Sequence, residues 1–315
     1  MNVIETRNLC KQYGKKTAVT GMNMHVQQGD IYGFIGRNGS GKSTTLKMLC
    51  GLAHPTAGSI RLFGQPAEDI SVRRRVGALI ETTGFDPTAS AYENMMRKAI
   101  LMGISDPKPE IEKLLVLCGL NAADRKKTKQ FSMGMKQRLG IAMALLGGPD
   151  LLILDEPING LDPEGMAEIR RLFVTLNEER GITILISSHI LGELSKIATR
   201  YGILKDGVLI REITSEQLYS ACRDYLYVKV TDAQKAAAAL EEFLDIHDYE
   251  IQPEGEVRIF EPADSAAVTQ ALLEHHIGVV AIYPHRQNLE EYFLELMEEK
   301  TPSDPATKKG GRHNA

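Results

Sequence analysis

The stretch GRNGSGKST, residues 36–44, decides the fold of the N-terminal part of this chain. Its spacing, GxxxxGK followed by Ser or Thr, lets backbone N–H groups close around the phosphates of a nucleotide. The apolar run DIYGFIG (30–36) leads into the stretch, and STTLKMLCGL (43–52) follows with helical spacing of apolar residues. A plain glycine turn entering a helix is the alternative, which the preceding strand disfavours. The order strand, loop, helix predicts an α/β fold that holds phosphates.

The residues of this loop have separate expected roles. Lys42 would neutralise the β and γ phosphates of the nucleotide, and the Ser43 hydroxyl would bind Mg²⁺. The start of the following helix would add the positive end of its dipole. The residues expected to contact the nucleotide are Gly36, Arg37, Asn38, Gly39, Ser40, Gly41, Lys42, Ser43 and Thr44.

Two adjacent carboxylates, Asp155 and Glu156, end the nearly uncharged run LLILDEP (151–157). Unpaired burial of these charges would be costly, and a nearby cation would relieve that cost. In phosphoryl transfer the first acid can hold Mg²⁺, and the second can position or deprotonate the attacking water. An acidic cap on the following helix is the alternative. LLILD and ITILISS (182–188) are predicted parallel strands covered on both faces, joined by a helix over 163–180.

Composition limits the classes of partner. The chain has 315 residues, and its 37 Lys and Arg against 41 Asp and Glu give a net charge of −4. No overall positive field would attract nucleic acid, so no nucleic-acid partner is expected. Four well-separated cysteines suggest neither a zinc site nor a disulfide framework, and no secretory signal is visible at the N-terminus. No apolar run reaches the roughly 20 residues of a spanning helix. A cytosolic protein is expected.

Changes of pattern along the chain predict its domains. Residues 1–215 form a nucleotide-binding domain, within which about 89–148 reads as an all-helical subdomain. Residues 216–300 begin with the order β-α-β-β-α-β, which predicts a small C-terminal α+β domain compatible with a ferredoxin-like fold. Residues 301–315 are rich in Pro, Gly and charge, and we expect them to be disordered.

Five ordered motifs carry a resemblance to a known family. The phosphate loop, FSMGMKQRLGIAMALL (131–146), LLILDEP, NGLDP (159–163) and SSH (187–189) occur in this order at suitable separations. Over about residues 2–215 the chain resembles the ATP-binding subunits of ABC transporters. The resemblance implies a P-loop NTPase fold with a mixed sheet core and a helical subdomain. It also implies that the chain binds ATP and Mg²⁺ and hydrolyses ATP.

The resemblance implies an assembly as well. Two subunits would pair head to tail, with each ATP between the phosphate loop of one and the signature segment of the other. FSMGM stands where the family usually has Leu-Ser-Gly-Gly-Gln, so Ser132 and Gly134 are kept and their neighbours differ. Ser132 is also an ordinary N-cap, but an ordinary cap leaves Gly134 unexplained. A separate integral membrane permease would be the partner, placing the subunit on the cytoplasmic inner face of the cell membrane.

Three further residues take roles only through the resemblance. Tyr13 matches the aromatic that stacks on adenine, although a lone Tyr is more often part of a core. His189 matches the switch histidine at the γ-phosphate, although alone it would read as structural. Asp162 matches the segment that communicates across the dimer, and it is also a suitable N-cap before Pro163.

Glu81 is an informative departure from the family pattern. In GALIETTGFDP (77–87) it stands where a glutamine usually contacts Mg²⁺ and the attacking water. A glutamate oxygen still suits Mg²⁺ but adds a negative charge beside the γ-phosphate. With SMGMKQRLGIA and DEPINGLDP, Glu81 makes the chain similar to the branch that exports bacitracin and lantibiotics. Export of another drug, lipid or ion, or a soluble ABC ATPase acting on ribosomes or DNA, are the alternatives.

Overall fold

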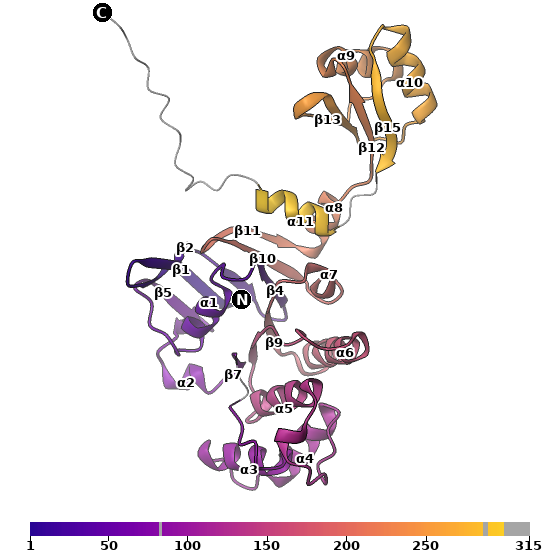
Figure 1. The fold of residues 1–315 in the computed structure, drawn as a ribbon. Helices are drawn as coiled ribbons and strands as arrows, with labels where there is room; N and C mark the ends of the chain where they lie inside the picture. The colour runs from indigo at the N-terminus through magenta and orange to yellow at the C-terminus, as the bar shows by residue number, and fades with distance from the viewer. Residues whose placement is uncertain (82–83, 286–288, 299–315) are drawn as a thin grey trace, which may run out of the picture. The chain divides into compact units, whose positions relative to one another are not determined.

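The computed structural model describes residues 1–81, 84–285 and 289–298. The chain divides into two compact units, Met1–Ser215 and Glu216–Ala315, and each is described by itself (Figure 1). The expected disordered tail, residues 301–315, lies outside the described residues.

The first sheet of the N-terminal unit is antiparallel and lies at the start of the chain. Its strand order is β2-β1-β5-β6, and β3 also pairs with β1. The strands are β1 (Asn2–Tyr13), β2 (Lys16–Met22), β3 (His25–Gln27), β5 (Ala57–Leu62) and β6 (Gln65–Pro66).

The second sheet is mostly parallel, and its order is β11-β10-β4-β9-β8-β7, with only β10 and β11 antiparallel. Its three middle strands β4, β9 and β8 are buried at every position, as their near-continuous apolar sequences require. The parallel pairing expected of the runs at 151–155 and 182–188 is confirmed. The strands are β4 (Ile31–Gly36), β7 (Val76–Leu79), β8 (Leu151–Asp155), β9 (Thr183–Ser188), β10 (Arg200–Lys205) and β11 (Val208–Thr214).

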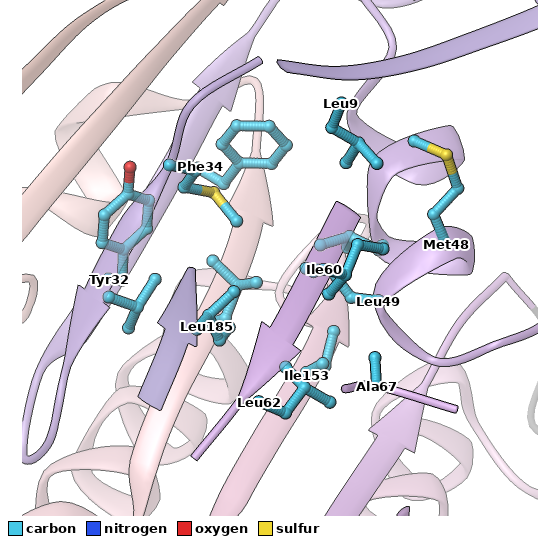
Figure 2. Close-up of a cluster of buried hydrophobic side chains, with 14 of the residues drawn as sticks. Leu9, Tyr32, Phe34, Met48, Leu49, Ile60, Leu62, Ala67, Ile153 and Leu185 are labelled. Carbon is cyan, nitrogen blue, oxygen red and sulfur yellow. The ribbon is translucent and has the colours of Figure 1, made fainter. Parts of the chain in front are cut away.

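One apolar core joins the two sheets. Helix α1 (Lys42–Leu49) contributes Met48 and Leu49, while β1 and β5 of the antiparallel sheet contribute Leu9 and Ile60 (Figure 2). Ile153 on β8 and Leu185 on β9 complete the cluster from the parallel sheet. Burying each such side chain contributes about 1.5–3 kcal/mol, so this core fixes β4 and α1, the two elements that flank the phosphate loop.

The segment predicted to be all-helical, about 89–148, contains helices and one isolated β-bridge, between Ser90 and Lys127. Its helices are α3 (Ala91–Leu101), α4 (Lys108–Leu117), η1 (Thr128–Gln130) and α5 (Met133–Leu145). Helix α6 (Pro163–Arg180) covers the predicted connection between β8 and β9. Its ends follow from sequence, because Asp162 caps the start and Gly181 ends it at φ 67°. The shorter helices are α2 (Ile70–Arg73), α7 (Leu191–Leu194) and α8 (Ser215–Ala221).

The C-terminal unit is built on an antiparallel sheet of order β13-β14-β12-β15. Helices α9 and α10 pack against one face of it, where Leu240 and Leu272 are buried with Val228 and Val257. The expected order β-α-β-β-α-β is present. The elements are β12 (Tyr225–Val230), α9 (Ala233–Leu244), β13 (Tyr249–Gln252), η2 (Pro253–Gly255), β14 (Glu256–Ile259), α10 (Ser265–Glu274), β15 (Val279–His285) and α11 (Leu289–Glu298).

Candidate nucleotide site

The phosphate loop lies between the end of β4 at Gly36 and the start of α1 at Lys42. Gly41 has φ 108°, and a Cβ there would lie 2.4 Å from the carbonyl oxygen of Ala18. A Cβ on Gly36 would lie 2.5 Å from both the Leu204 carbonyl oxygen and Ser40 Oγ. These two positions therefore require glycine, because the loop passes too close to its neighbours for any side chain.

A cavity of about 350 Å³ opens beside this loop. Its lining brings together residues from β1, β2, the loop, α1 and the segment after β8. They are Tyr13, Lys16, Ala18, Asn38, Gly39, Gly41, Lys42, Ser43, Thr44, Glu156 and Asn159. Eight of the residues expected at a nucleotide from the sequence thus line one cavity.

Lys42 is the buried cation of this cavity, with only 5% of its surface exposed. Its Nζ donates to the carbonyl oxygen of Gly36 at 2.6 Å and to that of Arg37 at 3.3 Å. The same atom lies 3.4 Å from Glu156 Oε1. A phosphate group would suit this ammonium, because a buried charge is stabilised by an opposite charge within hydrogen-bonding distance.

Ser40 provides an independent test of whether the loop fits a phosphate. Its Oγ is buried and has no hydrogen-bond partner within the part of the chain that the structure describes. A buried hydroxyl left unpaired destabilises a fold by about 1–3 kcal/mol. An anionic phosphate oxygen in the loop would accept a hydrogen bond from Ser40 Oγ, so the loop fits a bound phosphate.

The two carboxylates at the end of β8 are held differently. Asp155 is buried, and its Oδ1 accepts a hydrogen bond from Ser187 Oγ at 2.6 Å. Glu156 has φ 49°, an uncommon backbone conformation for a residue with a side chain, and its N–H donates to the same Ser187 Oγ at 3.0 Å. The bonds to β9 hold the turn that directs Glu156 toward the cavity.

His189 lies beside Glu156, as the chain leaves β9. Its Nδ1 is 2.9 Å from Glu156 Oε2, while Lys42 approaches the other oxygen. Gln137 Nε2 on α5 donates to the Glu156 carbonyl oxygen at 3.3 Å. Glu156 is therefore oriented from three elements, which is the arrangement expected for a carboxylate that positions water.

Tyr13 stands at the edge of the cavity, where half of its surface is exposed. Lys11 Nζ lies 4.8 Å from the centre of its ring. An exposed aromatic ring at a cavity edge is available for stacking, which separates Tyr13 from the core tyrosines Tyr32 and Tyr201.

Ser132, Gly134, Asp162 and Glu81 do not line this cavity. Ser132 Oγ caps α5 by accepting from the Met135 N–H at 3.2 Å, and Asp162 Oδ1 caps α6 by accepting from the Gly165 N–H at 3.1 Å. Both residues thus act as helix N-caps in this structure. A cap does not prevent either residue from also contacting a nucleotide bound to a partner subunit.

Glu81 is held by a neighbouring cation. Its Oε1 accepts from Lys47 Nζ on α1 at 2.5 Å, and this bond raises the pKa of Lys47. Glu81 has φ 59° and is mostly exposed. The extra negative charge noted in the sequence is therefore paired with Lys47 in this structure.

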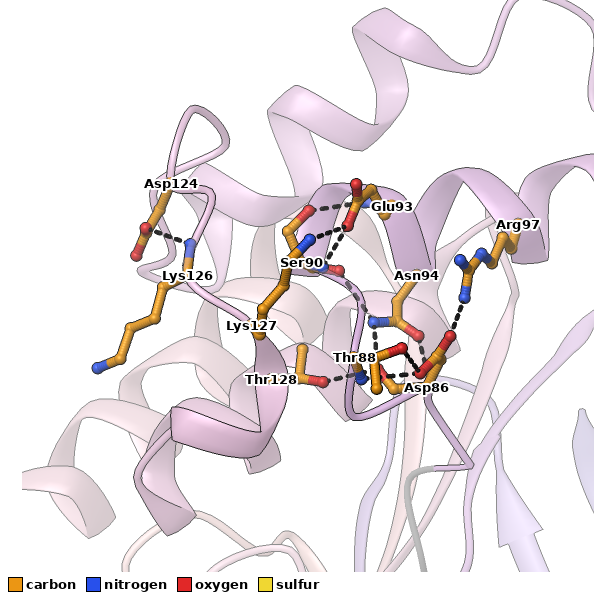
Figure 3. Close-up of polar contacts among 10 residues, drawn as sticks. All are labelled: Asp86, Thr88, Ser90, Glu93, Asn94, Arg97, Asp124, Lys126, Lys127 and Thr128. Atoms are coloured by element: carbon orange, nitrogen blue, oxygen red, sulfur yellow. Dashed lines mark hydrogen bonds and ion pairs between the residues drawn. The ribbon is translucent and has the colours of Figure 1, made fainter.

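A hydrogen-bonded network joins Asp86 to the helical subdomain (Figure 3). Asp86 Oδ1 accepts from the N–H and Oγ1 of Thr88 at 2.8 and 2.6 Å, and Arg97 pairs with its Oδ2. Its backbone carbonyl oxygen accepts from Asn94 Nδ2 at 3.1 Å and from Thr128 Oγ1 at 2.8 Å. The two bonds from Thr88, the side-chain bond first, and the pairing with Arg97 lower the pKa of the Asp86 carboxyl group to about 2.

Several residues of the site are not among those predicted from the sequence. Lys16, Ala18 and Asn159 line the cavity, and Ser187 and Gln137 hold Glu156. Ser187 lies in the SSH motif, which was read for its histidine, so a signal for it existed. Asn159 and Gln137 lie in the NGLDP and FSMGMKQRLGIAMALL motifs without an assigned role, whereas Lys16 and Ala18, on β2, lie in no motif.

Comparison with known proteins identifies the family. A sequence model described as ABC transporter matches residues 19–159. The chain is 43% identical over 298 residues to the bacitracin transport ATP-binding protein BcrA of Bacillus licheniformis, a match that covers 94% of this chain and 97% of that protein. The chain belongs to the ATP-binding subunits of ABC transporters. It is an ATPase that hydrolyses ATP for transport.

Two further matches agree with this assignment. The lantibiotic transport ATP-binding protein SrtF of Streptococcus pyogenes is 43% identical over 210 residues, covering 67% of this subunit and 90% of that protein. The dimeric structure of a post-hydrolysis state of the ATP-binding cassette MJ0796, bound to ADP and Pi, matches with a TM-score of 0.61 and 26% identity. That match covers 67% of this chain and 98% of the cassette. The family and the likeness to the bacitracin and lantibiotic branch, both expected from the motifs, are confirmed.

Proposed function

We propose that this ABC subunit powers a separate membrane permease that exports peptide antibiotics of the bacitracin or lantibiotic type. The support for the cargo is the likeness to BcrA and SrtF over most of the chain. Among the described residues no helix is both long enough and apolar enough to cross a membrane. We therefore propose that the subunit acts at the cytoplasmic face of the membrane, bound to its permease.

The orientation of Glu156 is the observation that carries the proposed chemistry. Lys42, His189 and Ser187 hold this residue beside the phosphate loop within the distances given above. We assign Glu156 the positioning or deprotonation of water, Lys42 the neutralisation of phosphate charge, and His189 the orientation of Glu156. Mg²⁺, held by Ser43 and Asp155, would supply charge neutralisation at the phosphates.

Gly134 supports pairing of two subunits. A Cβ at this position would meet only Leu161 Cδ2, at an ordinary 3.7 Å, so packing within the chain does not require glycine there. Glycine inside a helix costs about 1 kcal/mol relative to alanine. We propose that the missing side chain instead lets a partner's nucleotide approach Ser132 and the start of α5, with Asp162 nearby in the dimer interface.

The C-terminal unit is proposed to be an accessory domain with a ferredoxin-like arrangement. Its strand order and the placement of α9 and α10 on one face fit the split β-α-β pattern. We propose the boundary at residue 215 or 216, with the nucleotide-binding domain on its N-terminal side.

The test is recovery of a partner from native membranes. ATP-loaded Glu156→Gln protein, added to detergent-solubilised membranes, should retain a polytopic membrane protein at near-equal amounts, identified by mass spectrometry. Recovery of ribosomes, nucleic acid or soluble proteins alone would contradict the proposal. For the cargo, a deletion strain should become sensitive to peptide antibiotics, and sensitivity to other drugs alone would assign a different cargo.

A further inference from the structure

The C-terminal unit contains a second cavity, of about 650 Å³, which the ATPase function does not use. Four elements form its walls: α8, β13, the end of β14 and α11. All of its lining residues belong to the unit Glu216–Ala315. We call it the C-terminal cavity.

The cavity borders the sheet face that α9 and α10 leave uncovered. Alternate residues of a strand point to opposite faces, so Val228 faces the helices and Tyr227 faces away. On the uncovered face Tyr225 stacks on His285 and Tyr227 stacks on Tyr283, both with ring centres 4.7 Å apart. Phe260 lies edge-on to Tyr225 at 5.7 Å and lines the cavity. Tyr225 is buried, so the accessible part of this face, which we call the aromatic sheet face, is the Tyr227–Tyr283 pair.

The two arginines of the cavity are already neutralised. Arg223 pairs with Asp248 at 2.7 Å, and its guanidinium lies 4.5 Å from the Phe260 ring centre. Arg258 pairs with Glu256 at 2.7 Å and with Glu295 at 3.2 Å. An anionic ligand would have to displace these carboxylates, so the cavity is not built for an anion.

Charge favours a cationic occupant instead. Glu216 on α8 and Glu250 on β13 are exposed carboxylates that line the cavity. Residues 216–285 contain thirteen Asp and Glu and four Lys and Arg, a net charge of −9, whereas the net charge of the whole chain is −4. Aromatic rings bind guanidinium and ammonium groups. The Phe260 and Tyr225 rings already carry Arg223 and Arg258, at 4.5 and 5.0 Å, so Tyr227 and Tyr283 are the rings that would meet such a group.

We propose that the C-terminal cavity and the aromatic sheet face dock a Lys- and Arg-rich cytoplasmic segment of the permease. This inference rests on the proposed function. Cytoplasmic segments of membrane proteins carry an excess of Lys and Arg, so the permease offers such a partner close to the ATPase. Anionic lipid headgroups would repel the acidic unit, which makes the protein partner the better fit.

Site-specific photocross-linking in cells that contain the permease tests the docking. A photoreactive phenylalanine analogue replaces Ser220, an exposed cavity residue on α8, or Ala238, an exposed control residue on α9. The expected result is an adduct from position 220 only, mapped by mass spectrometry to a basic cytoplasmic segment of the permease. An adduct with residues 299–315 of this chain, equal adducts from both positions, or no adduct overturns the inference.

A charge-matched pair of variants tests the chemistry. The double variant Glu216→Gln, Glu250→Gln should lower the adduct yield about fivefold, because each substitution removes one exposed ion pair with the basic segment. Glu242→Gln with Glu274→Gln makes the same charge change on exposed positions of α9 and α10 and should alter the yield less than about twofold. Equal losses in both pairs would contradict a specific site.

Co-purification separates this inference from the proposed function. The ATP-loaded Glu156→Gln pull-down is repeated on the same membranes. Permease recovered without a position-220 adduct leaves the transport function standing and overturns only the docking site. No permease recovered overturns both.

Discussion

Single residues of the nucleotide site occupy backbone conformations that few side chains tolerate. Gly41 has φ 108° and Glu156 has φ 49°. Such conformations cost about 1–3 kcal/mol each for residues other than glycine. They persist here because the strands on either side are fully buried, and they set the loop amides and the Glu156 carboxylate beside one cavity.

Gly41→Ala should abolish tight nucleotide binding. The new Cβ would meet the Ala18 carbonyl oxygen at 2.4 Å, so the loop must move away from its bound shape. We expect ATP affinity to fall at least about tenfold, the equivalent of about 1.4 kcal/mol, as measured by titration calorimetry. Gly29→Ala is the control, because Gly29 has φ 83° but nothing within 4 Å of its Cβ. Equal affinities in the two variants would be inconsistent with this account.

Glu81→Gln should strengthen ATP binding by about threefold, because it releases Lys47 on α1, the helix that follows the phosphate loop, from its ion pair. The pKa of Lys47 should fall toward its ordinary value, since the Glu81 bond raises it. Fluorescent-nucleotide titration and ATPase rates provide the measurement, with Glu68→Gln as an exposed control. Unchanged ATP affinity, ATPase rate and resistance would remove any role for this carboxylate in coupling.

The sequence predicts candidate site residues mainly where they lie next to one another in the chain. The phosphate loop and the Asp155–Glu156 pair are contiguous, and each follows a strand that its own apolar residues predict. Asn159 and Gln137 lie within the NGLDP and FSMGMKQRLGIAMALL motifs, but those motifs were interpreted through Asp162, Ser132 and Gly134. Their contacts depend on distances set only by the folded chain.

At the scale of elements, local patterns predicted the parallel strands, α6 and the helical subdomain, because apolar periodicity and caps act within each segment. The network around Asp86 could not be predicted in this way. It joins Asp86 to Asn94 and Thr128, which lie 8 and 42 residues further along the chain. It fixes the chain between Asp86 and the start of α3.

Asp86→Asn should remove a pH-dependent part of the stability. The folded pKa of about 2 lies below the ordinary value of 3.8, so ionised Asp86 stabilises the fold above about pH 4. That contribution is lost as pH falls toward 2. In urea unfolding, the difference between wild type and variant in the free energy of unfolding should therefore become smaller as the pH falls from about 4 toward 2. Asp106 lies outside the network, so for Asp106→Asn this difference in the free energy of unfolding should not change with pH. A difference that stays constant with pH for Asp86→Asn would contradict the pKa argument.

At the scale of the whole molecule, the two units differ in charge and in task. The N-terminal unit carries the ATPase site, and the C-terminal unit is strongly acidic over residues 216–285. The motifs sufficed to find the family because their order spans most of the N-terminal unit. They said nothing about the C-terminal cavity, whose walls come from segments up to about 80 residues apart and carry no motif.

The most direct test of the central claim is steady-state ATP hydrolysis by Glu156→Gln protein, together with its ATP affinity. We predict that turnover falls at least about a thousandfold, about 4 kcal/mol in activation free energy, while ATP affinity stays within about threefold of wild type. ATP should also trap the variant as a dimer in size-exclusion chromatography. Near-normal hydrolysis by this variant would show that Glu156 is not the catalytic carboxylate and would contradict the account.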